Sequence, residues 1–533
     1  MTVEKLITDH IDIWSSALQT RSTAGRGSNG KIDLYGIKKL RELILELAVR
    51  GKLVPQDPND EPASELLKRI AAEKAELLKQ GKIKKQKPLP EISEDEKPFE
   101  LPSGWEWVRL GDAVEVINGR AYKKHEMLQT GTPLLRVGNL FTSNEWYYSD
   151  LELDEDKYID KDDLIYAWSA SFGPFIWQGD KVIYHYHIWK LKLFSESALS
   201  KYFLHDYLAS ITEKIKSQGN GIAMLHMTKE RMEKQVIALP PLAEQINIVS
   251  KIKELMSLCD QLEQQTLTSL DAHSQLVETL LATLTESQNA EELAENWARI
   301  SLHFDTLFTT EASIDALKQT VLQLAVMGLL IESAEFSQLD HLKKHLSFGP
   351  KNGLSPSEVK YETDIKVLKL GATSYGYLKL QETKYVDIDV SDKLHLFLKK
   401  NDILIQRGNS SNFVGCSLLI EEDFDNLIYP DLMMKIKTKD ELLPEYATLW
   451  LSSPFARNYM WSKMTGTSGT MPKISKKVVE DVPIAVPPLA VQHQLVIKIK
   501  ELFLLCGSLK SRLQSAQQTQ LHLADALTDA ALN

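Results

Sequence analysis

The chain has 533 residues, of which 43% are apolar and 25% charged, with a formal net charge of −11. At about 150 residues per domain, this length excludes a single small module, and the composition excludes a mostly disordered or fibrous chain. The negative charge argues against a protein that coats nucleic acid non-specifically, because such binding needs a basic surface. Any nucleic-acid contact is therefore expected to be local or shared with a basic partner.

Apolar runs stop short of the roughly 20 residues that cross a bilayer, and acids near the N-terminus do not fit a signal peptide. We therefore expect a cytoplasmic protein. The cysteines, Cys259, Cys416 and Cys506, include no CxxC pair, so we expect reduced thiols and no zinc site.

The first 100 residues predict a helical N-terminal region, with helices over Lys38–Arg50 and Glu65–Lys79. The Lys/Pro/Glu stretch Lys79–Lys97 is typical of a solvated linker, although its lysines could also meet phosphates. The sequence Gly25–Lys31 is close to the motif of a phosphate-binding loop, but Ile32 occupies the position of the Ser or Thr that binds magnesium. An ATP site is not expected there.

An internal repeat organises the rest of the chain. Leu239–Leu262 reads LPPLAEQINIVSKIKELMSLCDQL, and Val486–Leu509 reads VPPLAVQHQLVIKIKELFLLCGSL in the same register. Leu40–Leu53 is similar to Leu317–Leu330 in the same way. The chain is therefore two copies of one plan: helix, variable block, Pro-Pro, helix.

Each Pro-Pro pair predicts an extended segment followed by the first turn of a helix. Apolar residues then recur at spacings of four and three, which is a heptad seam. The residues expected to pack in this seam are Ile252, Leu255, Cys259, Leu262, Ile499, Leu502, Cys506 and Leu509. We expect Leu255 and Leu502 to pack against each other's helices, and the two cysteines to serve as small apolar core residues.

The two variable blocks are rich in Tyr, Trp, Gly and short β-type runs such as Leu164–Trp168 and Asp402–Ile405. The predicted fold is mixed α/β (α+β), with two similar domains separated by long antiparallel coiled-coil helices in a pseudo-twofold internal repeat. The predicted segments are an N-terminal helical region and charged linker (1–100), a first domain (101–239), central helices (240–338), a second domain (339–486) and a C-terminal helix (487–533).

Candidate catalytic motifs are incomplete. Pro430-Asp431 could open a nuclease motif, but no acid that would hold a metal stands beside Lys435. His185 and His187, two apart on a predicted strand, would face the same way as zinc ligands do, yet they lack a third ligand. A base or phosphate contact, or an ordinary surface position, stays open for them. The sequence also has no Gly-rich AdoMet loop after a strand and no Asn-Pro-Pro-aromatic methylation motif.

Loop residues of both blocks supply the groups that read DNA, since Arg and Lys suit guanine, and Asn and Gln suit adenine. The candidates in the first block are Tyr122, Lys123, Lys124, Arg136, Asn139, Ser169, Ser171, Gln218 and Asn220. The candidates in the second are Lys369, Arg407, Asn409, Ser410, Asn412, Thr467 and Lys473.

A family resemblance rests on four segments: KLRELILELAVRGKLVPQDP (Lys39–Pro58), LPSGWEWVRLGD (Leu101–Asp112), PPLAEQ (Pro240–Gln245) and the TGTSG turn (Thr465–Gly469). With them the chain resembles the specificity subunit of a type I restriction-modification system, a phage-defence complex. The resemblance implies two target recognition domains that bind double-stranded DNA. It also implies conserved helices that dock two methyltransferase subunits and, through them, restriction subunits.

The resemblance further implies a non-catalytic subunit that binds no metal or cofactor, with AdoMet, ATP and Mg on the partner subunits. One departure is that the second copy has Val491 where the first has Glu244. A contact that depends on this acid is therefore in doubt in the second copy.

Two similar modules on antiparallel helices can read two different short sequences. About 40 helical residues at ~1.5 Å rise span roughly 60 Å, enough to hold the modules one duplex turn, about 34 Å, apart. The pattern thus predicts a bipartite, asymmetric DNA site. The alternative is a protein-binding scaffold whose paired domains recognise peptides or other subunits.

Overall fold

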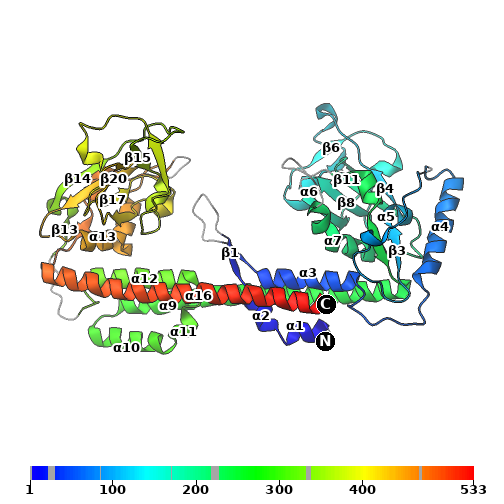
Figure 1. The fold of residues 1–533 in the computed structure, drawn as a ribbon, viewed down its shortest axis with the longest axis horizontal. Coiled ribbons are helices and arrows are strands. Elements are labelled where there is room, and N and C mark those ends of the chain that lie inside the picture. Colours follow the sequence, from blue (N-terminus) through cyan, green and yellow to red (C-terminus); the bar gives the residue numbers. More distant parts are fainter. Residues whose placement is uncertain are drawn as a thin grey trace. The chain divides into compact units, whose positions relative to one another are not determined.

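The computed structural model describes residues 3–21, 31–84, 86–169, 171–217, 227–331, 338–466 and 471–532. Two compact units are present (Figure 1). Unit 1 comprises Met1–Leu18, Leu34–Thr266 and Gln520–Asn533, and unit 2 comprises Gln19–Asp33 and Leu267–Thr519. No helix among the described residues is long and apolar enough to cross a membrane. Most of the Gly25–Lys31 motif lies outside the described residues.

The helices outside the two domains include two very long ones. These are α9 (Leu242–Glu286) and α16 (Leu489–Leu532), each of which begins just after its Pro-Pro pair, as predicted. The shorter helices are α1 (Val3–Thr8), α2 (Ile11–Ser16), α3 (Tyr35–Val49), α4 (Ala63–Lys79), α10 (Ala290–Leu302), α11 (Phe304–Leu307) and α12 (Glu311–Val326). A short hairpin joins β1 (Gln19–Arg21) to β2 (Lys31–Asp33).

Domain 1, in unit 1, contains helices and two four-stranded sheets, one antiparallel and one mixed, which fits the predicted α+β fold. Its strands are β3 (Glu106–Arg109), β4 (Val114–Asn118), β5 (Thr132–Leu135), β6 (Tyr147–Ser149), β7 (Tyr158–Ile159), β8 (Leu164–Ser169), β9 (Ser171–Ile176), β10 (Val182–Tyr184), β11 (Ile188–Leu193) and β12 (Val236–Leu239). They are ordered β4-β11-β8-β9 and β6-β5-β10-β7, with β12 paired to β3. The helices are α5 (Leu110–Ala113), α6 (Val137–Phe141), α7 (Lys201–Ser217) and α8 (Lys229–Glu233).

Domain 2, in unit 2, has a similar topology, with three strands in its second sheet where domain 1 has four. Its strands are β13 (Asp340–His341), β14 (Leu346–Asn352), β15 (Ile365–Leu368), β16 (Thr383–Val386), β17 (Ile403–Gln406), β18 (Ser417–Leu419), β19 (Leu427–Ile428), β20 (Met433–Thr438) and β21 (Pro483–Ile484). The orders are β14-β20-β17-β18 and β16-β15-β19, with β13 paired to β21. The helices are α13 (Pro444–Ser452), α14 (Pro454–Ser462) and α15 (Lys476–Glu480), and short 3₁₀ turns η5 (Leu370–Thr373) and η7 (Ser411–Phe413) lie in loops.

An Asp–Lys ion pair occupies the same place in the two domains, partly buried in domain 1 and buried in domain 2. Asp163 pairs with Lys190 at 2.6 Å in domain 1, and Asp402 pairs with Lys435 at 2.8 Å in domain 2. Each lysine also donates to a backbone carbonyl, that of Tyr158 or of Phe397. Asp163-Leu164-Ile165 and Asp402-Ile403-Leu404 therefore occupy the same place in one fold. Lys435 is a core residue rather than part of a nuclease motif.

The heptad seam in unit 1 packs as predicted. Ile252, Leu255, Cys259 and Leu262 are all buried, in a core that includes α3 residues and Ala524 near the C-terminal end of α16. Arg41 of α3 reaches Asp260 and Glu263 of α9, each at 2.7 Å. Burial raises the pKa of the Cys259 thiol to about 11, which suits a core residue and not a reactive thiol.

The seam in unit 2 differs from the expectation at one position. Ile499 and Cys506 are buried, whereas Leu502 and Leu509 are only partly buried. Cys506 lies in a cluster with Val277 and Leu281 of α9, but Leu502 packs on a cluster of α12 and domain 2 that contains no described α9 residue. The prediction that Leu255 and Leu502 pack on each other's helices is therefore wrong for Leu502, because α12 occupies that face of α16.

The charged stretch after α4 is mostly exposed, but it is not a free linker. Arg109, which is buried, donates to the carbonyls of Pro90 and Glu91 and forms a bidentate ion pair with Glu96 at 2.7 and 2.8 Å. This guanidinium lowers the pKa of the Glu96 carboxyl to about 2. The side chain of Arg109 therefore holds the described residues 86–97 against domain 1.

Glu244 joins three of the segments on which the family resemblance rests. Its carboxylate is buried and accepts hydrogen bonds from the indole N–H of Trp105 at 2.8 Å and from the amide of Gln56 at 3.3 Å. Burial raises the pKa of this carboxyl. Val491 stands at the equivalent place in α16 and cannot accept these bonds, so the junction belongs to unit 1.

Candidate nucleic-acid interface

In domain 1, aromatic side chains gather where β8 ends and where β10 turns into β11. Trp168 stacks on Trp189 with ring centroids 5.3 Å apart, and its indole N–H donates to the carbonyl of Tyr186 at 2.9 Å. The rings of Tyr186 and His187 lie 4.0 Å apart, and Tyr186 is 40% exposed. Packing on three sides holds these rings in fixed positions at the surface, as base recognition requires.

His185 and His187 both lie between β10 and β11. The prediction that they lie on a strand is therefore wrong. Their rings are 4.8 Å apart, and no group of three His, Cys, Asp or Glu residues in the described part of the chain could hold a metal ion. Burial, with help from His187 and Arg136, lowers the pKa of His185 to about 4. His185 is therefore neutral at pH 7 and offers hydrogen bonds, not charge.

Arg136 and Asn139 flank the start of α6, close to this turn. The guanidinium of Arg136 lies 4.5 Å from the ring centre of Tyr147, and its Nε is buried with no partner among the described residues. The amide of Asn139 is held at both ends, since it accepts from the Arg136 N–H and donates to the Glu145 carbonyl at 2.7 Å. Asn139 therefore shapes the loop that presents Arg136.

The other candidate residues of domain 1 differ in how far they are exposed to solvent. Lys123 and Lys124 are exposed, beside an Arg120–Glu126 pair at 2.8 Å. Tyr122 lies in the core with Leu134 and Ile183, and burial raises its pKa to about 12. Ser169 is buried as well, whereas Ser171 is partly exposed. Gln218 and Asn220 lie outside the described residues.

We expected Tyr122 and Ser169 in exposed loops, and this placement is wrong. Tyr122 is drawn inward because Arg120 bridges to His185 and continues the sheet edge. Ser169 is the last residue of β8 and pairs with Ser171 across a tight hairpin. A direct DNA contact by either residue remains only a prediction.

In domain 2, a buried glutamine fastens two loops together at the end of β17. Gln406 donates to the Leu370 carbonyl at 3.1 Å and to the hydroxyls of Thr373 and Ser374, both at 3.0 Å. Asn409 donates to the Gln406 side chain at 2.7 Å and accepts from the Ser410 N–H. Asn409 is thus a loop-shaping residue, and Arg407 is presented by a rigid support.

An exposed aromatic pair beside this loop was missed in the sequence. Tyr375 and Tyr377 are 61% and 58% exposed, and the ammonium of Lys379 lies 4.2 Å from the ring centre of Tyr375. Tyr375 also contacts Phe413, with ring centroids 5.7 Å apart. Aromatic and basic side chains interleaved around a glycine, as in SYGYLK (Ser374–Lys379), were the available signal.

The remaining candidates of domain 2 lie on the same loops. Arg407 and Lys473 are partly exposed, and Lys473 pairs through its backbone with Gly408 and Thr465. Asn412 is exposed and Ser410 is partly exposed. Lys369 precedes η5, as Arg136 precedes α6, and its ammonium lies 3.4 Å from the Glu358 carboxylate. Thr467 lies outside the described residues.

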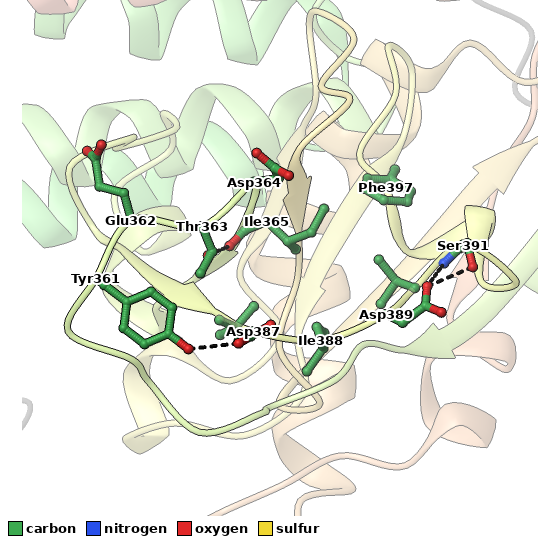
Figure 2. Close-up of a pocket in the computed structure, with 12 residues that line it drawn as sticks. Tyr361, Glu362, Thr363, Asp364, Ile365, Asp387, Ile388, Asp389, Ser391 and Phe397 are labelled. Carbon is green, nitrogen blue, oxygen red and sulfur yellow. Dashed lines mark hydrogen bonds between the residues drawn. The ribbon is translucent and has the colours of Figure 1, made fainter.

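The opposite end of the β15–β16 hairpin is acidic. A cavity of about 510 Å³ is lined there by Glu362, Asp364, Asp387 and Asp389 (Figure 2). Asp387 accepts a hydrogen bond from the Tyr361 hydroxyl at 2.7 Å, and Asp389 accepts from Ser391. Carboxylates repel phosphate, so this end is unsuited to DNA. The end that carries Lys369, Arg407 and Lys473 is the candidate interface of domain 2.

The comparison with known families decides what these two domains are. The family described as "Type I restriction modification DNA specificity domain" matches residues 102–272 and 350–516, which include most of domains 1 and 2. The chain belongs to this family. It is a specificity subunit of a type I restriction-modification system, with two target recognition domains.

Similar proteins of the family extend over the whole chain. The EcoEI specificity subunit of Escherichia coli is 44% identical, and the EcoAI specificity subunit of Escherichia coli is 43% identical; each alignment covers all of both chains. The specificity subunit is also similar in fold to a chain from a solved structure described as "Structural basis underlying complex assembly and conformational transition of the type I R-M system". The TM-score is 0.50 at 16% identity, over 82% of this chain and 99% of that chain.

Proposed function

We propose that this specificity subunit reads a bipartite, asymmetric sequence in double-stranded DNA, with domain 1 on one half-site and domain 2 on the other. It docks two methyltransferase subunits through its helices and, through them, restriction subunits. It has no catalytic activity of its own.

The observation that carries the proposal is a common framework with different loop side chains. Both domains keep a similar strand order and an Asp–Lys ion pair at the same place in the sheet. The loop surfaces differ, because domain 1 presents Trp168 and Tyr186 while domain 2 presents Arg407, Tyr375 and Lys379. Two readers of one fold with different surface chemistry suit two different half-sites.

The test is DNA binding by the full chain assembled with its methyltransferase partner. The probe is a duplex that carries the sequence found by methylation mapping in the host, and the competitors have one or both half-sites scrambled. We expect scrambling either half-site to weaken binding at least tenfold at physiological salt. Equal retention of scrambled and intact duplexes would favour the scaffold alternative, in which the paired domains bind protein.

The absence of cofactor binding is also proposed and can be tested separately. We expect AdoMet, ATP and Mg to bind the partner subunits, and isothermal titration of the purified chain with AdoMet to give no heat of binding. The assembled complex, titrated in parallel, is the positive control. Tight AdoMet binding by the isolated chain would contradict a purely recognition role.

A further inference from the structure

Trp168 and Arg407 occupy the same place in their two domains. Each lies five residues after the aspartate of the Asp–Lys pair, Asp163 or Asp402. The Trp168 N–H donates to the His187 carbonyl at 3.1 Å, and the Arg407 N–H donates to the Leu432 carbonyl at 2.8 Å. Both acceptors lie three residues before the lysine that pairs with that aspartate. The two backbones are therefore held by the same hydrogen bond in the same topology.

The framework around this position is also the same in both domains. A buried tyrosine lies at the end of the strand that precedes the acceptor turn in domain 1, Tyr184, and directly after that strand in domain 2, Tyr429. A glycine approaches that tyrosine's strand so closely that an added Cβ would lie 2.3 Å from the His185 carbonyl oxygen at Gly119, or 1.8 Å from the Tyr429 carbonyl oxygen at Gly353. The side chain at this position differs, being an indole in domain 1 and a guanidinium in domain 2.

Both side chains are presented in an ordered way. The Trp168 ring is fixed by its stack on Trp189 and by its hydrogen bond to the Tyr186 carbonyl. Arg407 follows Gln406, whose amide holds the loop through three donated hydrogen bonds. No hydrogen bond or ion pair joins the Arg407 guanidinium to another described residue. A guanidinium carries five N–H donors in a planar arrangement.

We propose that this shared position selects one base pair in each half-site. Arg407 binds the O6 and N7 atoms of a guanine in the half-site of domain 2, and Trp168 makes an apolar contact with a thymine methyl group in the half-site of domain 1. The inference rests on the proposed function and assigns the difference between the two half-sites to one structural position. A good base contact of this kind discriminates against the wrong base by about 5- to 150-fold.

The experiment measures affinity of the chain–methyltransferase complex for a panel of duplexes with single-base changes across both half-sites. Arg407→Ala should remove discrimination at one position of one half-site and leave the other half-site unchanged. Trp168→Arg should change the preferred base at one position of the other half-site, towards guanine. Glu362→Gln, in the acidic cavity, is the control and should leave the whole profile unchanged.

Melting temperatures separate folding from recognition. If the melting temperature of Trp168→Arg is lower than that of the wild type, Trp168→Phe is used instead. Trp168→Phe should reduce discrimination between bases at that same single position. Arg407→Ala removes no hydrogen bond or ion pair to a described residue and should melt as the wild type does. If Arg407→Ala lowers the affinity for all duplexes equally, Arg407 contacts a phosphate. If the affinity profile does not change, Arg407 does not contact DNA. Either result overturns the inference. The proposed function fails on different evidence, namely a wild-type profile with no second half-site.

Discussion

Gln245 and Gln492 make the same three hydrogen bonds in the two halves of the chain. Gln245 accepts from the Ser200 N–H at 2.7 Å and donates to the carbonyls of Ala198 and Pro240. Gln492 accepts from the Leu443 N–H at 2.9 Å and donates to the carbonyls of Glu441 and Pro487. In each half, one buried amide joins the Pro-Pro segment and the start of a domain helix to the long helix.

Replacing either glutamine by alanine should loosen the junction between a domain and its helix. The change leaves buried backbone groups without partners, which costs about 2–4 kcal/mol. Thermal unfolding of Gln245→Ala and Gln492→Ala measures this cost. Asn247→Ala and Gln494→Ala change exposed residues nearby on the same helices and should be neutral. Equal stability of all four variants would mean that the matched hydrogen bonds contribute nothing.

A charge in the seam of unit 1 should be strongly destabilising. Leu255 is fully buried, so Leu255→Lys places an unpaired ammonium in an apolar core and should cost about 3–5 kcal/mol, together with loss of partner assembly. Leu258, 44% exposed on the same helix, supplies the control Leu258→Lys. Unfolding curves that coincide for the two variants would contradict the packing of α9 described above.

Low pH should detach residues 86–97 from domain 1 by breaking the ion pair between Glu96 and Arg109. The pKa of Glu96 is lowered from 4.5 to about 2 by Arg109, so its ion pair contributes stability that is present above pH 4.5 and is lost as pH falls towards 2. Hydrogen exchange in residues 86–97 should therefore rise over this range, relative to the core of domain 1. Glu96→Gln should exchange rapidly already at pH 6, whereas Glu94→Gln, at an exposed side chain, should behave as the wild type.

A heptad is a local pattern, and so the seam at Ile252, Cys259 and Cys506 could be predicted from spacing alone. Leu502 could not, because its neighbour α12 comes from a segment about 180 residues away. The loop positions were also hard to predict, because their contacts come from segments that are distant in the sequence. Gln406 stands in a polar run that suggests a surface tip, yet it is buried because Thr373 and Ser374, more than 30 residues earlier, supply its partners.

The candidate site was predicted in part. Arg136 and Lys369 lie on matching loops, and Arg407 lies in the loop after β17, because each follows a strand whose apolar run is visible in the sequence. Trp168 and Tyr186 were missed as a pair, since their contact depends on two turns brought together by β8 and β11. The equivalence of Trp168 and Arg407 follows only from backbone hydrogen bonds, which a sequence with divergent loops does not reveal.

The central claim is that each domain reads its own half-site independently. Exchange of Leu101–Ala238 for the matching block of a related specificity subunit tests it most directly, because domain 1 has its own sheets and core. Methylation mapping in cells that carry the exchanged subunit and its partners should show one half-site replaced, with the other half-site and the spacer unchanged. A recognised sequence altered in both halves, or in neither, would contradict the account.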